Sequence, residues 1–165
     1  MKLAISTDHA GFMDSQKLIE FLSSKGHQCF NFGPITYQEN DDYPDFIFPA
    51  AKAVADGSCE RGIIMGGSGE GEAMAANRTK GIRCSVYYGP AKAIQAIDAE
   101  GHIDNDSYEI IKLSREHNDA NMLSIAARFV DYSEIEKIID LWLSIPFGAD
   151  ERHQRRNQKL DEESI

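Results

Sequence analysis

The chain has 165 residues, of which 42% are hydrophobic and 27% are charged, and its formal net charge at pH 7 is −10. This length fits one domain with a buried core, so we expect residues 1–165 to form a single domain. The acidic balance argues against nucleic acid and anionic membranes as partners, because binding to either requires a basic face.

Neither a membrane span nor a secretory leader is expected. No run of about 18 apolar residues occurs, and the N-terminal MKLAISTDHAG reaches Asp8 and His9 too early for a signal peptide. We therefore expect a cytoplasmic protein. Cys29, Cys59 and Cys84 include no CxxC pair, so we expect reduced, mostly buried thiols rather than a zinc site or a disulfide framework.

Short apolar runs alternate with amphipathic segments along the chain. The first half predicts strands at 2–7, 28–32 and 61–66, with helices at 12–25 and about 45–56. The second half predicts a helix at about 70–79, a strand at 82–88, a mostly helical region at 90–118 broken by EGHIDNDS, a strand at 122–127 and a helix at 133–146. The remaining segment, about 147–165, is a highly charged tail.

This alternation predicts an α/β fold. We expect a three-layer, doubly wound, Rossmann-like sheet of five parallel strands, with helices on both faces and a C-terminal helical tail. Ligands of such sheets bind outside the carboxyl ends of the strands. That rule selects Asp8 and His9, the loop at 66–72, Tyr87 and Tyr88, and Arg128.

The loop that opens the segment GGSGEGEAMAAN, residues 66–77, contains four glycines in six residues. Glycines let the backbone approach a ligand closely, and N–H groups at a helix start favour negative charge. The loop is not a Walker A motif, because no Lys-Ser/Thr follows the last glycine, and its spacing does not match GxGxxG. It could therefore stabilise a phosphate or a developing oxyanion.

Two carboxylates, Glu70 and Glu72, interrupt this loop. A carboxylate in the first helical turn would repel a phosphate. It would suit a general base that removes a proton from carbon while nearby N–H groups receive the enolate charge. The alternative is that both side chains only complement the helix dipole.

Three other polar clusters have both a functional and a structural interpretation. Asp8-His9 is either a ligand contact or a hydrogen-bonded surface pair. The stretch 114–119 is either a proton-transfer site at His117 or a capped turn. Arg152 and Arg156 share a helical face. They either bind one phosphate or pair with Asp150, Glu151, Asp161 and Glu162 on a solvated helix.

Taken together and in this order, the motifs resemble the ribose-5-phosphate isomerase B family, which includes the galactose-6-phosphate isomerase subunits. The matching pieces are Asp8-His9-Ala10-Gly11, Asp42-Tyr43-Pro44, Gly67-Ser68-Gly69 through Ala75-Ala76-Asn77, Gly81-Ile82-Arg83, His117-Asn118-Asp119-Ala120-Asn121, Ala127-Arg128 and Arg152-His153-Gln154-Arg155-Arg156. The resemblance implies an aldose–ketose isomerase of a phosphorylated sugar that uses a cis-enediolate and neither metal nor cofactor. It also implies a homodimer or a dimer of dimers, with each site built from two subunits.

The resemblance assigns a role to each matching residue. It implies that Glu72 moves the proton between C1 and C2 and that His117 opens the sugar ring. The other implied contacts are Asp8 and Tyr43 to sugar hydroxyls, Ser68 with the backbone of Gly67, Gly69 and Gly71 and with Asn118 to the enediolate, and His9, Arg128, Arg152 and Arg156 to the phosphate. The arginine tail would come from the neighbouring chain, and Glu70 would be a solvated residue without a role.

Two departures from the family pattern affect these expectations. Some members have a cysteine base where this chain has Gly66, so this sequence resembles the type that uses a glutamate at the position of Glu72. The segment between Pro90 and Ser107, including residues 91–106, is longer than in compact members. It leaves the ligand edge, where loops tune specificity, unless it is a surface elaboration or a subunit contact.

Several functions stay open at this point. Ribose 5-phosphate is the default substrate, with tetrose phosphates, allose 6-phosphate and galactose 6-phosphate as alternatives. A nucleotide- or flavin-binding module would need neither Glu72 nor His117. A sugar-phosphate sensor on the same fold would bind without turnover.

Overall fold

The computed structural model describes residues 1–98 and 100–163. Five parallel strands form one sheet in the order β2-β1-β3-β5-β4. The strands are β1 (Lys2–Thr7), β2 (Gln28–Asn31), β3 (Arg61–Gly66), β4 (Cys84–Tyr87) and β5 (Met122–Ala126). The predicted doubly wound α/β fold is confirmed.

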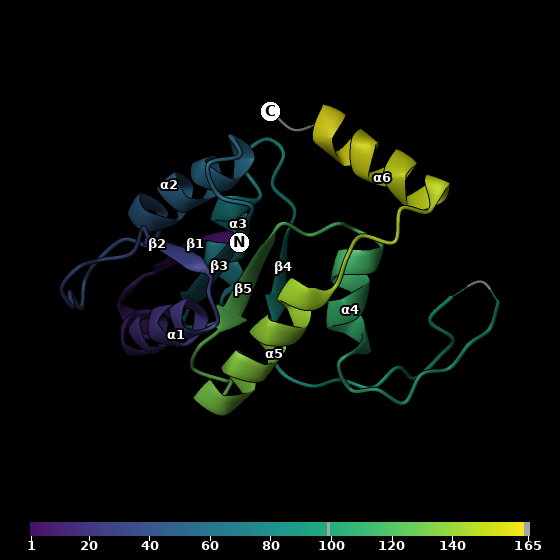
Figure 1. The fold of residues 1–165 in the computed structure, drawn as a ribbon, viewed down its shortest axis with the longest axis horizontal. Coiled ribbons are helices and arrows are strands. Elements are labelled where there is room, and N and C mark those ends of the chain that lie inside the picture. The colour runs from purple at the N-terminus through teal and green to yellow at the C-terminus, as the bar shows by residue number, and fades with distance from the viewer. Residues whose placement is uncertain (99, 164–165) are drawn as a thin grey trace.

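Helices cover both faces of this sheet (Figure 1). They are the short 3-10 turn η1 (His9–Gly11) and the helices α1 (Phe12–Ser24), α2 (Pro44–Ala55), α3 (Glu70–Ala76), α4 (Glu109–Glu116), α5 (Tyr132–Ser144) and α6 (Glu151–Glu162). Within the described residues, none of them is long and apolar enough to cross a bilayer.

Two hydrophobic cores lie between the sheet and its helices. On one face, Leu18 of α1 and Trp142 of α5 are fully buried against the strands. On the other face, Ile47 of α2 and Ala76 of α3 are fully buried. Because both faces are covered, the central strands are buried along almost their whole length and are mostly apolar rather than alternating. The same burial explains why short apolar runs marked the strands in the sequence.

The register of the strands brings three carboxyl ends together. Thr7 at the end of β1 pairs with Met65 of β3, and Gly66 at the end of β3 pairs with Ala126 of β5. The chain runs outward from β1 to β2 on one side and to β3 on the other, so a crevice opens between β1 and β3. The residues that follow these three strands therefore meet at one edge of the sheet.

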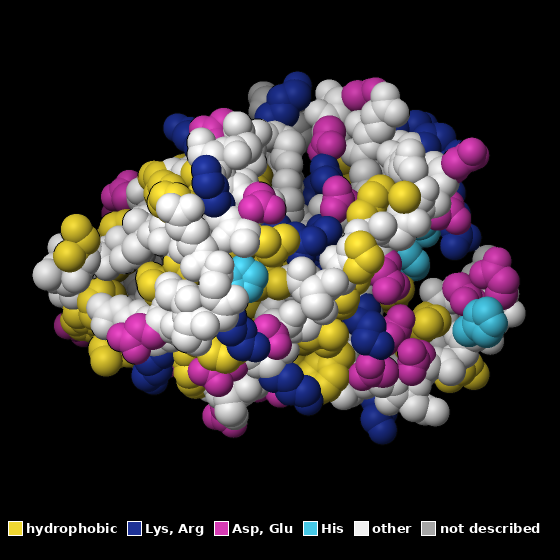
Figure 2. All heavy atoms as spheres, viewed as in Figure 1, with side chains coloured by type: hydrophobic (Ala, Val, Ile, Leu, Met, Phe, Trp, Pro, Cys, Tyr) yellow, Lys and Arg dark blue, Asp and Glu magenta, His cyan; other side chains and the backbone are white. Residues whose placement is uncertain are grey.

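The region 90–118 departs from the prediction of a mostly helical segment. Among the described residues of this region, only α4, Glu109–Glu116, is an α-helix, and those before it form a projecting loop (Figure 1). The predicted helix has no surface to pack on, since Ile94 is 95% exposed, and helical propensity without packing rarely holds a short helix. The base of the loop closes where the Ala91 N–H donates to the Ser107 carbonyl at 2.8 Å. Acidic side chains gather at its tip (Figure 2).

The cysteines contribute to the packing of the two cores. Cys59 is buried, Cys29 and Cys84 are half-buried, and all three are free thiols. Burial raises the pKa of the Cys59 thiol.

Candidate active site

A cavity of about 340 Å³ opens at the sheet edge where β1, β3 and β5 end. Its volume is near the lower end of the range for small-molecule sites. The residues that line it are Asp8, His9, Ala10, Tyr43, Gly67, Ser68, Gly71, Glu72 and Arg128. The structure thus brings together eight of the residues selected from the sequence, from positions 8 to 128.

Glu72 is the buried carboxylate of this cavity. It lies in the first turn of α3 and is only 4% exposed. Burial raises the pKa of its carboxyl group, and the negative charge of Asp8 raises it further. Glu72 therefore presents a buried carboxylate with a raised pKa to the cavity.

Gly66 makes room for that carboxylate. A Cβ atom at position 66 would lie 1.9 Å from Cδ of Glu72, a distance that no pair of carbon atoms can adopt without a bond. The space at the end of β3 therefore holds either a side chain at position 66 or the Glu72 carboxylate. The sequence led us to expect a glutamate base in place of a cysteine. This steric exclusion gives a physical reason why a chain would have one or the other.

The loop between β3 and α3 turns sharply at Gly69. Gly69 has φ of 75°, in the left-handed region that side chains avoid. Its carbonyl accepts a hydrogen bond from the Ser124 hydroxyl at 2.6 Å, which ties the loop to β5. This anchored turn presents Ser68 at the cavity, with its hydroxyl 3.4 Å from the Glu70 amide nitrogen.

The side chains of Tyr43 and Arg128 pack against the two ends of this loop. The Tyr43 ring lies against Gly71, with Cζ 2.9 Å from where a Cβ would be. The Arg128 guanidinium lies against Gly67, with Cζ 3.3 Å from a Cβ built there. The Arg128 amide also donates to the Gly67 carbonyl at 3.1 Å. A cationic and a phenolic group thus flank the buried Glu72.

Asp8 and His9 follow β1 and are held by hydrogen bonds. The Asp8 carboxylate accepts the Ala10 N–H at 2.9 Å. The His9 ring nitrogen Nδ1 lies 2.7 Å from Oδ1 of Asp41, a residue that the sequence interpretation missed. Asp41 belongs to the loop before α2, and only its place beside the matched Asp42-Tyr43-Pro44 motif could have suggested it.

The donor atoms of Asp8, His9 and Asp41 lie within 4.8 Å of one another, close enough for one metal ion. The hydrogen bonds that each residue makes explain the cluster without an ion. We therefore assign no metal to it.

Glu70 and the two tyrosines of the β4 end lie outside the cavity. Tyr87 is 1% exposed and donates to a Glu134 oxygen at 2.5 Å, so it is a core residue. The Tyr88 hydroxyl donates to the exposed Glu70 carboxylate. The rule that selected strand ends therefore placed Tyr87 wrongly, because its ring points into the core.

The remaining predicted site residues form a second group at the opposite end of the sheet. His117 and Arg152 line another cavity, of about 260 Å³. The His117 ring stacks on His153, with centroids 4.0 Å apart. Burial and the neighbouring His117 lower the pKa of His153. Asn118 adjoins His117, and Arg156 lies one turn after Arg152 on α6.

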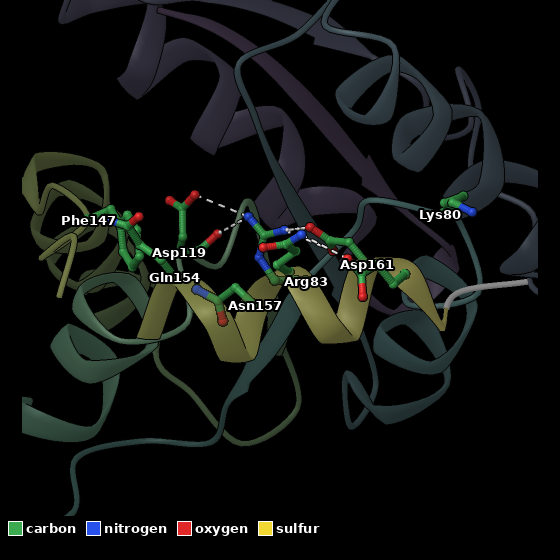
Figure 3. Close-up of a pocket in the computed structure, with 9 residues that line it drawn as sticks. Lys80, Arg83, Asp119, Phe147, Gln154, Asn157 and Asp161 are labelled. Carbon is green, nitrogen blue, oxygen red and sulfur yellow. Dashed lines mark hydrogen bonds and ion pairs between the residues drawn. The ribbon is translucent and has the colours of Figure 1, made fainter. Parts of the chain in front are cut away.

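Arg83 attaches α6 to this second group. Its guanidinium lies between Asp119 and Asp161 (Figure 3) and donates to an Asp161 oxygen at 2.8 Å and to the Asp119 carboxylate at 3.1 Å. Its Nε donates to the Asn118 carbonyl at 2.9 Å. The Asn157 amide of α6 donates to the His117 carbonyl at 3.1 Å. These contacts join α6 and the turn 117–119 into one unit.

A single chain keeps the two groups apart. Asn118 precedes β5 and Arg128 follows it, and this five-residue strand is about 16 Å long at about 3.3 Å per residue. Among the described residues, none lines both cavities. Glu72 and His117 therefore do not meet within one chain.

Comparisons with known proteins agree over almost the whole chain. A family model described as Ribose/Galactose Isomerase matches residues 3–102 and 105–160. The chain is 35% identical over 162 residues to ribose-5-phosphate isomerase B of Mycolicibacterium paratuberculosis, covering 98% of this chain and 91% of that protein. It is 32% identical over 159 residues to ribose-5-phosphate isomerase B of Escherichia coli, covering 96% and 93%.

Solved structures show the same similarity. Ribose-5-phosphate isomerase B of Clostridium thermocellum superposes with a TM-score of 0.83 at 34% identity, over 98% of this chain and 96% of that one. The enzyme of Mycoplasma genitalium with bound ribulose 5-phosphate gives a TM-score of 0.83 at 33% identity, over 98% and 94%. The break in the family match, residues 103–104, falls inside the projecting loop.

Proposed function

Because this chain belongs to the ribose/galactose isomerase family, we propose that it interconverts ribose 5-phosphate and ribulose 5-phosphate through a cis-enediolate. The observation that carries the proposal is Glu72, a buried carboxylate that lines a cavity beside a histidine and an arginine. The ribulose 5-phosphate in the Mycoplasma genitalium structure supports a five-carbon substrate.

Glu72 acts as the base. Its carboxylate removes the proton from C2 of the aldose, which leaves the enediolate charge on O1, and returns that proton to C1. The O2 hydroxyl proton passes to O1 in the same conversion, so the carbonyl moves from C1 to C2 without net loss or gain of a proton. The raised pKa of Glu72 makes the carboxylate a stronger base than a solvated one, which suits proton removal from carbon. Burial also excludes the water that would compete for that proton.

Polar groups around the loop stabilise the enediolate. Ser68 and the backbone N–H groups of residues 67–71 face the developing negative charge. Asp8 and Tyr43 bind the sugar hydroxyls, and both line the cavity. His9 and Arg128, at the same cavity, bind the phosphate. The loop thus cradles an oxyanion, and the phosphate binds on cationic side chains beside it.

We assign the rest of the site to a second copy of the chain. His117 would open the ring, Asn118 would contact the enediolate, and Arg152 and Arg156 would bind the phosphate. Their distance from Glu72 within one chain supports a homodimer or a dimer of dimers in which α6 serves a neighbouring site. The described part of the tail, residues 147–163, would then lie on or near the partner subunit; the last two residues of the expected tail, 164–165, lie outside the described residues.

Proton exchange at C2 tests the reaction and the base together. Wild type and Glu72→Gln are incubated with ribose 5-phosphate in D₂O and followed by NMR. We expect wild type to exchange the C2 proton and form ketose, and Glu72→Gln to do neither. Glu70→Gln is the matched control, because Glu70 is exposed and two residues away, and it should exchange normally.

Other outcomes identify the alternatives. If wild type is inactive on ribose 5-phosphate but active on a tetrose phosphate, allose 6-phosphate or galactose 6-phosphate, the class stands and the substrate is corrected. Binding of sugar phosphates without any turnover would indicate a sensor. Retention of a nucleotide or flavin would indicate a cofactor-binding module.

A further inference from the structure

Asp41 touches His9 through two separate hydrogen bonds. Its Oδ1 atom lies 2.7 Å from the His9 Nδ1 atom and accepts the His9 main-chain N–H at 3.1 Å. One oxygen therefore holds both the backbone and the ring of His9, from a position 32 residues along the chain. This double contact restricts the ring far more than a single surface bond would.

The Asp41 carboxylate is withdrawn from solvent. Its side chain is 3% exposed, whereas the His9 side chain is 26% exposed. Its second oxygen, Oδ2, is buried and has no hydrogen-bond partner among the described residues. A buried carboxylate with one unpaired oxygen costs free energy of folding, so stability alone does not account for Asp41 at this position.

The contact decides which nitrogen of His9 is available. With Nδ1 turned to Asp41, the proton on Nδ1 points at a carboxylate and Nε2 is the remaining nitrogen. A neutral ring of this tautomer can only accept at Nε2. A ring that carries a proton on each nitrogen donates at both, so Nδ1 can donate to Asp41 while Nε2 donates to a phosphate.

We propose that Asp41 is a positioning residue for phosphate recognition, which fixes the His9 ring with Nδ1 toward Asp41 and thereby leaves Nε2 for the hydrogen bond to the substrate phosphate. This inference rests on the proposed function, because it takes His9 as a phosphate contact. Asp41 itself does not line the cavity and acts through His9.

The test compares Asp41→Asn with wild type on ribose 5-phosphate. The amide keeps the shape and one acceptor but removes the charge. Hydrogen bonds to charged groups contribute enough that we expect KM to rise at least about tenfold, with kcat changed less than about threefold. Glu39→Gln is the matched control, because Glu39 is an exposed carboxylate of the same loop, and its KM should equal that of wild type.

A double-mutant cycle separates positioning from simple support of the loop. In a His9→Asn background, Asp41→Asn should raise KM by less than about twofold, because the residue through which it acts is already gone. If Asp41 only supported the loop, Asp41→Asn would raise KM by the same factor in the wild-type and the His9→Asn backgrounds. Asp41→Ser replaces Asp41→Asn in the cycle if the amide variant does not fold.

NMR can report the state of the His9 imidazole nitrogens without any need for turnover. The ¹⁵N shifts of His9 are recorded with and without inorganic phosphate in wild type and Asp41→Asn. We expect a proton on Nδ1 and a phosphate-dependent change at Nε2 in wild type, and a weaker change in the variant.

Identical shifts and responses in both proteins, or additive effects on KM, would overturn the role of Asp41. If wild type proves inactive on ribose 5-phosphate, the proposed function fails, and the phosphate titration still decides the question of Asp41.

Discussion

At the scale of single residues, the Glu72 carboxylate fills the space that any side chain at position 66 would need. The two positions are six residues apart and belong to different elements, β3 and α3. Gly66 has no side chain to react, but it sets where the Glu72 carboxylate lies. Changes at position 66 should therefore affect the reaction through Glu72.

Gly66→Ala should displace the Glu72 carboxylate and lower kcat by at least about a hundredfold, the range seen when a general base is lost. The measurement is steady-state kinetics together with thermal unfolding. Gly57→Ala is the control, because Gly57 has φ of 80° and open space around its Cβ position. It should lower stability by about 1 kcal/mol while keeping kcat. Equal kcat in Gly66→Ala and wild type would contradict the steric account.

The raised pKa of Glu72 predicts how activity depends on pH. The base must be deprotonated, so kcat/KM should rise as pH rises through the pKa of Glu72. This acid limb should lie above the ordinary range for a glutamate. A pH–rate profile measures it, and a flat profile between about pH 5 and 8 would count against a raised pKa.

The same shift has a consequence for stability. When the pKa of a carboxyl group is higher in the folded state than in the unfolded state, the group stabilises the fold at low pH. The free energy of unfolding then falls as pH rises through the folded pKa. At neutral pH Glu72 therefore costs stability, and Glu72→Gln should be at least as stable as wild type while inactive. Thermal unfolding of both proteins across that pH range checks the sign.

At the scale of elements, α6 presents two arginines on one face while Arg83 and Asn157 hold the helix to the turn 117–119. Arg152→Ala and Arg156→Ala should each raise KM for the sugar phosphate about tenfold or more, with little loss of stability because Arg156 is exposed and the Arg152 side chain is 38% exposed. Arg155→Ala, which removes another exposed arginine of the same helix to which no phosphate role is assigned, is the control. An unchanged KM in both variants would remove their phosphate role.

We expect the fold to tolerate removal of the projecting loop between residues 90 and 108. Its base is already closed by the bond between Ala91 and Ser107, and Ile94 and Ile103 are exposed. Replacing residues 92–106 by a short Gly-Ser linker should leave the melting temperature within a few degrees of wild type. If the loop tunes specificity, the order of kcat/KM among five-, four- and six-carbon sugar phosphates should change. An unchanged order would leave the surface or subunit-contact interpretation.

At the scale of the whole molecule, the two groups of site residues lie at opposite ends of one sheet. A site that needs both must take them from two copies of the chain. Glu72→Gln and His117→Asn should each be inactive alone. After mixing and subunit exchange, half of the dimers are mixed and each has one intact site, so activity should return to about a quarter of wild type. Two variants that stay inactive together would indicate sites built within one chain.

Much of this fold was predictable because its signals are local. Short apolar runs marked the strands, since strands covered on both faces are mostly apolar. The rule for carboxyl ends then selected Asp8, His9 and Arg128 for the cavity that the structure shows. The predicted helix around Ile94 was wrong, because its apolar residues have no surface to pack on. The predicted place of Tyr87 at the ligand edge was also wrong, because its side chain points into the core.

The sequence by itself determined the α/β class, the glycine loop with its carboxylate, and the resemblance that assigns each residue a role. Only the tertiary structure decided that Glu72 is buried over Gly66, that Asp41 holds His9, and that His117 lies far from both. Residue type and spacing are properties of neighbours along the chain. Contacts between residues 32 or more positions apart depend on strand order and register, which appear only when the sheet is assembled.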